Sequence, residues 1–430
     1  MIPFIIVILS LIIIIIVRRK DKKINNPYFA FNVLWGFIGV LLIIGNKFFY
    51  SPSPLALWIV LVGFLGYNFS LLLASSHSFE DARFDTRHLC IVKKYQINYD
   101  VVLVLSFFVL VFSLYYGYNS IIKLINGVSL TDIRAEYFVY SDAESIFQYY
   151  FRNYVLNPLR DAVLICSIIC VLCREKHFKL LIFNCFVILA TQAITSGGRY
   201  AIINTIFMTV CTYSFYKSFT KINKKTKLIV FALLIIAIVS IIVLTNQRST
   251  SLTKNMTIIE RLWQTTFGYF AGSITYLGVI LERTPNLAFL TLGINFIGGF
   301  VTPFCTLLNF LHIASYPEIL NVIGNYASDV LPVGRDAAGF EIYYNALPTA
   351  FGYFYIDAGF VGTFFFSFIF GLICKKIYDR SANNLLLRCF YIFLFVQILN
   401  TSTRWLYFLP SYCLVFIYLL IIVRPQKAKC

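Results

Sequence analysis

The sequence predicts an all-α protein that crosses a membrane many times. Hydrophobic residues make up 59% of the chain and aromatic residues 18%, whereas charged residues make up only 13%. The mean hydropathy is +0.79, a value that a soluble domain does not reach. Apolar runs of membrane-spanning length alternate with short polar connections. These observations exclude a soluble enzyme and predict a polytopic membrane protein.

The chain begins with an apolar segment, residues 2–17, which is followed by Arg18-Arg19-Lys20. It has neither a charged n-region nor a small-residue cleavage site, so we expect a retained first helix and no signal peptide. Because a span needs about 17 to 25 apolar residues, the whole chain predicts about eleven to thirteen transmembrane helices. The other predicted spans are 28–44, 55–74, 99–116, 155–172, 180–194, 200–216, 228–245, 267–281, 286–313, 359–374, 385–400 and 405–423.

Two of these segments, 267–281 and 286–313, are rich in Gly and Thr and are weaker than the rest. Either both span the membrane or they are re-entrant or interfacial, and both alternatives leave the later helices with the same orientation. The sequence therefore predicts three parts. They are transmembrane helices over 1–245 with an outer loop at 117–154, a mainly outer loop region over 246–356, and C-terminal transmembrane helices over 357–430.

Basic residues orient the predicted helices. The positive-inside rule places the short basic connections in the cytoplasm, so we expect an outer N-terminus and a cytoplasmic C-terminus. Much of the net charge of +17 then reflects anchoring to anionic lipid. The basic connections are 18–23, 174–179, 217–227, 375–388 and the tail 424–429.

The predicted outer face carries arginine in preference to lysine. A topology signal has no reason to prefer arginine, whereas bidentate recognition of phosphate or carboxylate does, so we expect an anionic substrate. Some of these arginines are expected to be structural, above all Arg160 beside Asp161 and Arg261 beside Glu260. The outer basic residues are Arg134, Arg152, Arg160, Arg199, Arg248, Arg261, Arg335 and Arg404, against Lys47, Lys123 and Lys254.

The turn Thr195-Ser-Gly-Gly-Arg199 lies between two apolar runs. Gly197 and Gly198 lack Cβ atoms, so N–H groups at the start of the next helix can approach an anion, and Arg199 adds a fork of donors. The alternative is a tight membrane turn whose arginine reaches phospholipid headgroups. Arg404 lies in a second predicted outer turn of the same character and is a candidate for the same groove.

Carboxylates of the outer loops are candidates for a general base. The segment 329–341 is the densest polar stretch between predicted spans, and it contains Arg335, Asp336 and Glu341. Asp336 and Glu341 are the best candidates, although an ion pair with a neighbouring arginine is the alternative for each. The whole stretch has a second interpretation, as a lid. Asp357 is different, because it stands just before Gly359 at a predicted helix start and is expected to cap that helix.

Other residue patterns limit the function further. The eleven cysteines lie almost entirely inside apolar runs, where they act as small hydrophobes, so neither disulfides nor a metal site is expected. The chain has no DxD pair, and three of its four histidines lie in predicted cytoplasmic segments, which argues against metal-dependent nucleotide-sugar transfer. Tyrosines beside Arg152 and Asn345 fit either bilayer anchoring or stacking on sugar rings. The basic residues form no compact domain, so nucleic-acid binding is not expected.

Three short motifs occur along the sequence in an order that indicates a family resemblance. They are Thr195-Ser-Gly-Gly-Arg199, Asn246-Gln-Arg248-Ser, and the block from Asn345 through Tyr355-Ile-Asp357-Ala-Gly359-Phe-Val-Gly362. Together they resemble the family of Wzy-type oligosaccharide repeat unit polymerases, which make O-antigen and capsule. The resemblance covers nearly the whole chain as architecture, whereas its motifs are short.

The resemblance implies a bacterial inner-membrane glycosyltransferase with a GT-C-like general build and a periplasmic active site. Its substrate would be an undecaprenyl-pyrophosphate-linked oligosaccharide, without a metal or other cofactor, and its partners the lipid bilayer, a chain-length regulator and a flippase. The catalytic candidates are Asp336, Glu341 and Arg335. The candidates for binding pyrophosphate or glycan are Gly197, Gly198, Arg199, Arg248, Arg404, Arg134, Arg152, Tyr344 and Asn345.

Two alternatives stay open. An O-antigen ligase uses the same kind of lipid-linked donor and has a similar helical build. A lipid-linked oligosaccharide flippase has a comparable number of spans, but it should show an internal repeat and charges inside helices of both halves, and no such repeat is visible in this sequence.

Overall fold

The computed structural model is mostly helical, and the chain forms two compact units. Unit 1 comprises Met1–Glu80, Ser251–Asp379 and Gln397–Tyr412, and unit 2 comprises Asp81–Thr250, Arg380–Val396 and Cys413–Cys430. Each unit therefore combines segments from distant parts of the chain. The structure describes residues 1–73, 91–92, 95–129, 132–133, 146–173, 175, 177–196, 198–217, 231–232, 235, 239, 242, 258–284, 286–320, 330–335, 339–344 and 348–425.

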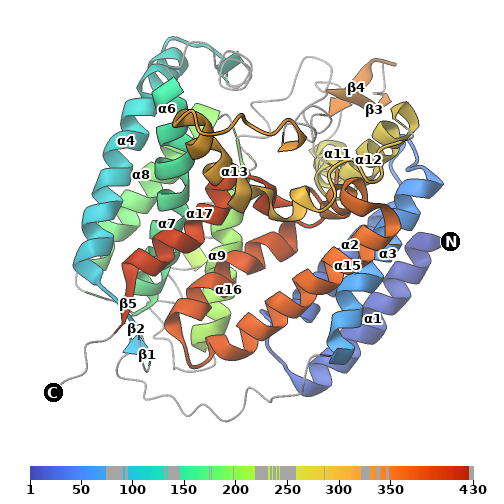
Figure 1. The fold of residues 1–430 in the computed structure, drawn as a ribbon, viewed down its shortest axis with the longest axis horizontal. Helices are drawn as coiled ribbons and strands as arrows, with labels where there is room; N and C mark the ends of the chain where they lie inside the picture. The colour runs from blue at the N-terminus through green and yellow to red at the C-terminus, as the bar shows by residue number, and fades with distance from the viewer. Residues whose placement is uncertain are drawn as a thin grey trace. The chain divides into compact units, whose positions relative to one another are not determined.

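The elements of unit 1 come from both ends of the chain (Figure 1). Its helices are α1 (Ile2–Lys20), α2 (Pro27–Ile44), α3 (Pro54–Leu73), α11 (Ile258–Phe270), α12 (Gly272–Arg283), α13 (Ile294–Phe310), most of α15 (Ala350–Ser381) and the short 3₁₀-helix η5 (Leu406–Phe408). A two-stranded antiparallel sheet consists of β3 (Leu331–Arg335) and β4 (Glu341–Tyr344).

Unit 2 is built mainly from the second quarter of the chain. Its helical elements are α4 (Tyr99–Ile125), α6 (Ile146–Tyr150), the π-helix η3 (Phe151–Leu156), α7 (Asn157–Cys173), α8 (Phe178–Ser196), α9 (Tyr200–Lys217), most of α16 (Leu385–Asn400) and most of α17 (Pro410–Ile422). A small antiparallel sheet has the strand order β1 (Ile91–Val92), β2 (Tyr95–Ile97), β5 (Val423–Pro425).

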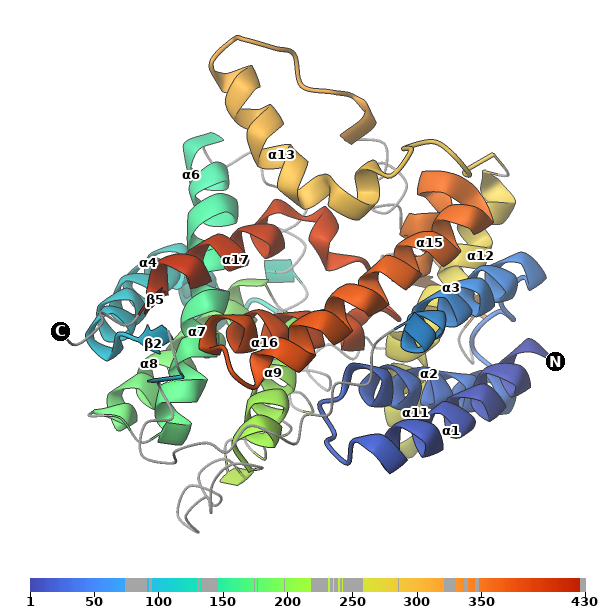
Figure 2. The same ribbon diagram turned by 60° about the horizontal axis from the view of Figure 1, so that its bottom comes forward.

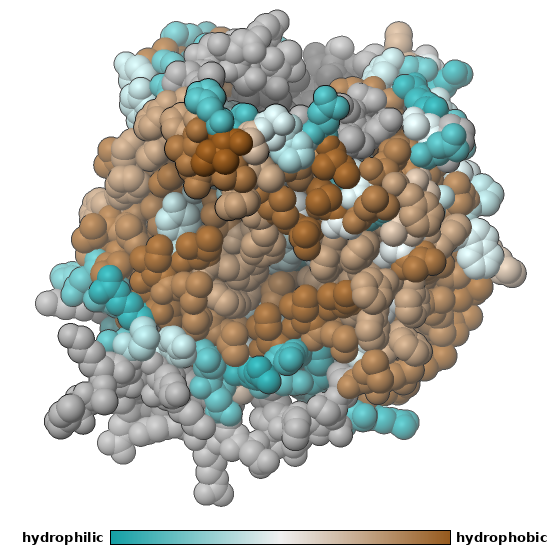
Figure 3. All heavy atoms as spheres, in the orientation of Figure 1, coloured by the Kyte–Doolittle hydropathy of each residue, from teal (hydrophilic) through white to brown (hydrophobic). Residues whose placement is uncertain are grey.

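Within the described residues, seven helices are long and apolar enough to cross a membrane. They are α1, α2, α3, α4, the continuous segment Phe147–Cys173, α8 and α15, and α13, α16 and α17 are shorter apolar helices. In unit 1, hydrophobic side chains cover the exposed faces of α1, α2, α3 and α15, while hydrophilic side chains gather near the helix ends (Figure 3). The prediction of a mostly helical, multi-span membrane protein agrees with these features.

Most predicted spans coincide with a helix, but the two weak segments differ. Residues 28–44 correspond to α2 and residues 385–400 to α16. The predicted span 267–281 is divided at Ala271 between α11 and α12, and only 294–310 of the second weak segment is helical, as α13. The predicted span 228–245 lies largely outside the described residues.

An aromatic core holds α2, α3 and α15 together in unit 1. Phe31 of α2 stacks on Tyr67 of α3 with ring centroids 3.8 Å apart, and Trp35 of α2 lies 4.9 Å from Phe351 of α15. The indole Nε1 of Trp35 donates a hydrogen bond to Thr401 Oγ1 at 3.1 Å. Buried aromatic pairs add about 0.5–1.5 kcal/mol each beyond their area burial, so this cluster fixes the spacing of the three helices.

Glycines allow α3 and α15 to approach closely, and the two helices lie side by side in both ribbon views (Figures 1 and 2). A Cβ atom on Gly66 of α3 would overlap the carbonyl oxygen of Phe364, and one on Gly371 of α15 would lie 2.8 Å from the carbonyl oxygen of Tyr67. Small residues have this role at many helix–helix contacts in membranes, where close backbone approach increases van der Waals attraction.

A similar contact and a polar bridge join the helices of unit 2. Gly117 of α4 faces Thr191 of α8 so closely that a Cβ atom would not fit between them. Asn184 of α8 donates through Nδ2 to Ser106 Oγ of α4 at 2.9 Å, and both side chains are buried. Packing and an interhelical hydrogen bond therefore stabilise the same helix pair.

The α3–α15 contact makes Gly66→Ala a sharp test of this packing. The added methyl group meets backbone, which cannot rotate away, so we expect a loss of about 1–3 kcal/mol in stability. The measurement is the midpoint of thermal unfolding of the purified protein in detergent. Leu65→Ala, on the exposed side of the same helix, is the control and should change the midpoint little. Equal midpoints for Gly66→Ala and the control would contradict the close packing.

Candidate functional site

The long helix α15 is interrupted inside unit 1. Ala358 and Gly359 have non-helical backbone angles, and Gly359 has φ +59°, a conformation that strains residues with a side chain. A chain segment just before α13 crosses the interruption, where the Leu290 N–H donates to the Ile356 carbonyl at 3.0 Å. In hydrocarbon, backbone groups freed by such a break need partners from the protein itself, and this hydrogen bond supplies one.

Asp357 stands at the interruption and is completely buried. Its carboxylate accepts hydrogen bonds from Thr291 Oγ1 at 2.7 Å and from the backbone N–H groups of Asn295 and Phe296, each at 3.0 Å. Those N–H groups belong to the first turn of α13, whose own N-cap residue makes no side-chain cap. Asp357 therefore caps a helix, as the sequence predicted, but the helix is α13 and not the one that begins at Gly359.

The predicted turn around Arg404 packs against the same helix start. The Arg404 N–H donates to the Asn400 carbonyl at 2.9 Å, and the Arg404 carbonyl accepts from Gln397 Nε2 at 3.1 Å. The next residue, Trp405, is buried, donates through Nε1 to the Phe296 carbonyl at 3.1 Å and stacks on the Phe296 ring at 5.2 Å. The backbone that carries Arg404 is thus fixed between its own turn and α13.

The β3–β4 hairpin carries three of the predicted site residues. Arg335 and Glu341 are cross-strand partners, so both side chains lie on one face of the hairpin, and both are exposed. Among the described residues neither charge is in an ion pair, whereas Glu341 Oε2 accepts a hydrogen bond from the Tyr343 hydroxyl at 2.6 Å. This contact raises the pKa of the Tyr343 hydroxyl, because its deprotonation would place a second negative charge beside the carboxylate.

The hairpin is bonded to its neighbours along both strands. The Arg335 N–H donates to the Phe48 carbonyl at 2.9 Å, and a Cβ atom on Gly334 would overlap that same oxygen. From the other strand, the Tyr344 hydroxyl donates to the Gly268 carbonyl at 2.5 Å. The hairpin is therefore attached to the α2–α3 connection and to α11.

In unit 2, the turn before α9 has Arg199 at the helix start. The Arg199 carbonyl accepts the first helical hydrogen bond, from the Ile203 N–H at 3.0 Å, and its side chain is half-buried. The Gly198 N–H donates to Ser196 Oγ at 3.1 Å. One N–H group that was expected to face an anion is thus already bonded within the turn, so anion binding here would depend on Arg199 and on the first N–H groups of α9.

Arg152 lies in the π-helix η3, which joins α6 to α7. The Asn157 N–H donates to the Arg152 carbonyl, the spacing that defines this wider helix. Tyr150 and Tyr154 contact each other edge to face on the same segment, with centroids 5.6 Å apart. Short π-helical turns occur often at functional sites, so Arg152 keeps its place among the candidates.

Arg160 is structural, as the sequence predicted. Its Nε donates to Asp161 Oδ1 at 2.8 Å, and its NH1 donates to Asn157 Oδ1 at 3.2 Å. Both charged side chains are almost completely buried on α7. For the other predicted pair, Glu260 forms an ion pair with Lys47 at 3.5 Å.

The predicted site residues are divided between the two units. Glu341, Arg335, Tyr344 and Arg404 belong to unit 1, and Gly198, Arg199 and Arg152 belong to unit 2. The remaining candidates, Asp336, Gly197, Arg248, Arg134 and Asn345, lie outside the described residues. Within the described part of the chain, no three His, Cys, Asp or Glu side chains are grouped as metal ligands would be.

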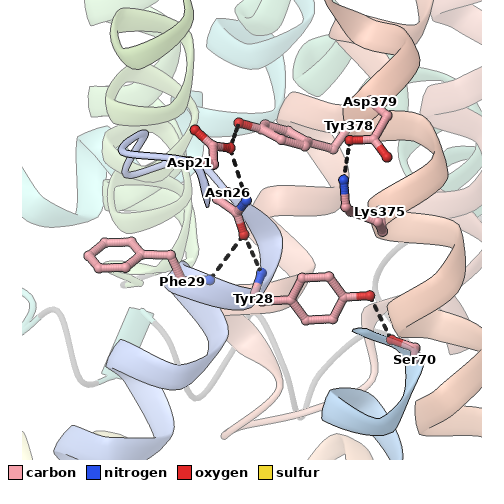
Figure 4. Close-up of polar contacts among 8 residues, drawn as sticks. All are labelled: Asp21, Asn26, Tyr28, Phe29, Ser70, Lys375, Tyr378 and Asp379. Carbon is pink, nitrogen blue, oxygen red and sulfur yellow. Dashed lines mark hydrogen bonds and ion pairs between the residues drawn. The ribbon is translucent and has the colours of Figure 1, made fainter. Parts of the chain in front are cut away.

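A polar cluster that the sequence did not reveal joins α1, α2 and α15 (Figure 4). Asp21 Oδ2 accepts hydrogen bonds from the Tyr378 hydroxyl at 2.6 Å and from Asn26 Nδ2 at 2.9 Å. Lys375 pairs with Asp379 one turn away on α15. Asp21 and Tyr378 are far apart in sequence. The sequence therefore contains no local signal for their contact beyond the basic composition of the connections 18–23 and 375–388.

No protein family, curated protein or solved structure was found to match the chain.

The buried Arg160–Asp161 pair gives a prediction about stability. Asp161→Asn leaves the arginine without its counter-charge, so we expect a loss of about 3–5 kcal/mol. The double variant Arg160→Leu with Asp161→Leu removes both charges and should be more stable than the single variant. Thermal unfolding in detergent measures both. A double variant less stable than Asp161→Asn would contradict the uncompensated charge of Arg160 as the cause of the loss.

Proposed function

We propose that the protein is a membrane glycosyltransferase of the oligosaccharide repeat unit polymerase type. The observation that carries the proposal is that arginines stand in turns at the ends of apolar helices, Arg199 after α8 and Arg404 between α16 and α17. A guanidinium at such a place suits a phosphate group at the bilayer surface, because its planar fork binds phosphate oxygens in pairs. Apolar helices of membrane-spanning length suit a substrate that is itself attached to a lipid.

The proposed reaction transfers a growing glycan between two lipid carriers. A hydroxyl oxygen of the next undecaprenyl-pyrophosphate-linked repeat unit attacks the anomeric carbon of the growing glycan, and its proton passes to a carboxylate. The bond from that carbon to the pyrophosphate oxygen breaks, and undecaprenyl pyrophosphate leaves with the bonding electrons. Negative charge develops on the leaving group, so fixed arginines stabilise the transition state without a metal or other cofactor.

The candidate residues have separate roles in this proposal. Each of Arg199, Arg404, Arg152, Arg134 and Arg248 is a candidate contact for pyrophosphate, with Gly197 and Gly198 leaving room for it beside Arg199. Tyr344 and Asn345 are candidate contacts for the glycan. Asp336 or Glu341 takes the proton, and Arg335 stands beside them on the hairpin. Glu341 is exposed and already bonded to Tyr343, so a role as base requires that the substrate displace this hydroxyl.

Two long-range contacts each join segments that the basic residues assign to the same side of the membrane. Asp21 and Tyr378 are bonded to each other, and both lie in connections assigned to the cytoplasm. Phe48 and Arg335 are bonded to each other, and both lie in segments assigned to the outer face. The positive-inside rule then decides which side is outer, and we propose an outer N-terminus, a cytoplasmic C-terminus and an active site on the outer face.

The proposal extends to the surroundings of the enzyme. We place it in the inner membrane of a bacterium, with the site facing the periplasm, about eleven to thirteen spans and a GT-C-like general build. Its partners are the lipid bilayer, the lipid-linked oligosaccharide, and the flippase and chain-length regulator of the same pathway. An O-antigen ligase is the nearest alternative, and a flippase is the second.

Deletion of the gene separates these three functions. For a polymerase, the ladder of long glycans on a gel of the cell surface is lost while one capped repeat unit remains. Complete loss of capping would instead identify a ligase, and accumulation of precursor on the cytoplasmic side would identify a flippase. An unchanged surface glycan would contradict all three.

Substitution of Arg199 tests the proposed pyrophosphate site. Arg199→Ala and Arg199→Lys should each lower polymerisation by about 100-fold or more, because neither replacement restores the fork of donors. The readout is the glycan ladder together with the amount of protein in the membrane fraction, which should not change. Arg19→Ala, an exposed arginine of the first basic connection, is the matched control. Normal long glycan in the Arg199 variants would contradict this role.

A further inference from the structure

Three segments of unit 1 meet at the backbone of Phe296. Its N–H donates to Asp357 of α15, and its carbonyl accepts from the indole of Trp405. Its ring lies parallel to the Trp405 ring, at an interplanar angle of 11°, and edge to face with Phe354 of α15 at 5.6 Å. Phe296 is therefore held through its backbone N–H, its backbone carbonyl and its side chain. It connects α15 to the turn after α16.

Asp357 is not available as a general base in this arrangement. In the described part of the chain, the hydrogen-bond partners of its carboxylate are donors, namely the Thr291 hydroxyl and backbone N–H groups at the start of α13, and the side chain has no exposed surface. The charge faces the first turn of α13, where it complements the positive end of the helix. A set made of donors alone likewise does not form a cation site. The group is built to hold α13.

Trp405 transmits this constraint to Arg404. The indole is 2% exposed and packs edge to face with Phe354 at 4.9 Å and with Phe370 at 5.0 Å. Arg404 precedes it directly, and the main chain of Arg404 is bonded on both sides within its own turn. Trp405 thus holds the main chain next to Arg404 against Phe296.

We infer that Asp357 is a positioning residue for Arg404, acting through Phe296 and Trp405. This inference rests on the proposed function, in which Arg404 stabilises the leaving pyrophosphate. An arginine that stabilises developing charge must be fixed before the reaction, and a misplacement of about 1 Å can cost about 100-fold in rate. The interrupted helix α15 supplies the rigid support, and the buried carboxylate joins that support to the turn.

The test compares two acid contacts of the same unit, of which Asp357 is buried and Asp21 is half-buried. Asp357→Asn exchanges an acceptor-only carboxylate for an amide whose NH₂ group cannot accept from the helix N–H groups. Asp21→Asn, which disturbs the bond to Tyr378 at the other polar cluster, is the matched control. The substrate is the lipid-linked repeat unit extracted from the gene-deletion strain, and the enzyme is the full chain in proteoliposomes.

We expect Asp357→Asn to lower kcat about tenfold or more with little change in KM, and Asp21→Asn to leave both unchanged. In an Arg404→Lys background, the same Asp357→Asn change should have much less effect, because the two residues act as one unit. Equal effects of Asp357→Asn in both backgrounds would overturn the inference and leave a general structural role.

Hydrogen exchange separates this inference from the proposed function. In Asp357→Asn, and not in Asp21→Asn, amides of residues 294–300 and of residues 401–409 should exchange faster. Unchanged exchange at 401–409 overturns the link to Arg404 whatever the activity. Faster exchange at both places, in a protein whose deletion leaves the surface glycan unchanged, keeps the link between the segments and rejects the proposed function with the role that it gives Arg404.

Discussion

Inside a membrane, the backbone groups that a broken helix releases must be bonded by the protein itself, and unit 1 is organised around that requirement. The interruption of α15 at Ala358 and Gly359 is bridged from the segment before α13, and Asp357 satisfies the first turn of α13 in return. Each of the two segments thus supplies a hydrogen-bond partner to the other. Because each one comes from a different part of the chain, the interruption draws α13 and α15 together where an unbroken helix would need neither contact.

The positions of most helices could be predicted from the sequence, because apolar length is a local signal. Residues 28–44 and 385–400 show this well. The helical turns before the interruption of α15 could not be predicted, since Asp357 ends the apolar run. The predicted span began at Gly359, where the structure has the interruption, whereas α15 extends back to Ala350. The carboxylate that interrupts the pattern is stabilised by Asn295 and Phe296, and no local rule relates residues so far apart.

The sequence indicated the roles of single site residues better than it indicated which of them lie together in space. Residue type alone identified Arg160 as structural, because the acid beside it in sequence is also its partner in space. Residue type also indicated that Asp357 caps a helix, but not which one. The polar stretch around Arg335 was visible, yet its two strands were not. Strand β3 depends on pairing with the distant residue Phe49 and on a glycine, Gly334, that lets the two backbones meet. Local chemistry was thus predictable, and the long-range pairing was not.

The small sheet of unit 2 has a topological consequence. Strand β2 leads directly into α4, and β5 follows α17 directly, and the two strands are hydrogen-bonded to each other through pairs such as Gln96 with Arg424. Strands that pair in this way lie on one side of the bilayer. The chain between them must then cross the membrane an even number of times. If the eight other predicted spans between these strands all cross, the two weak segments either both span or both stay on one side.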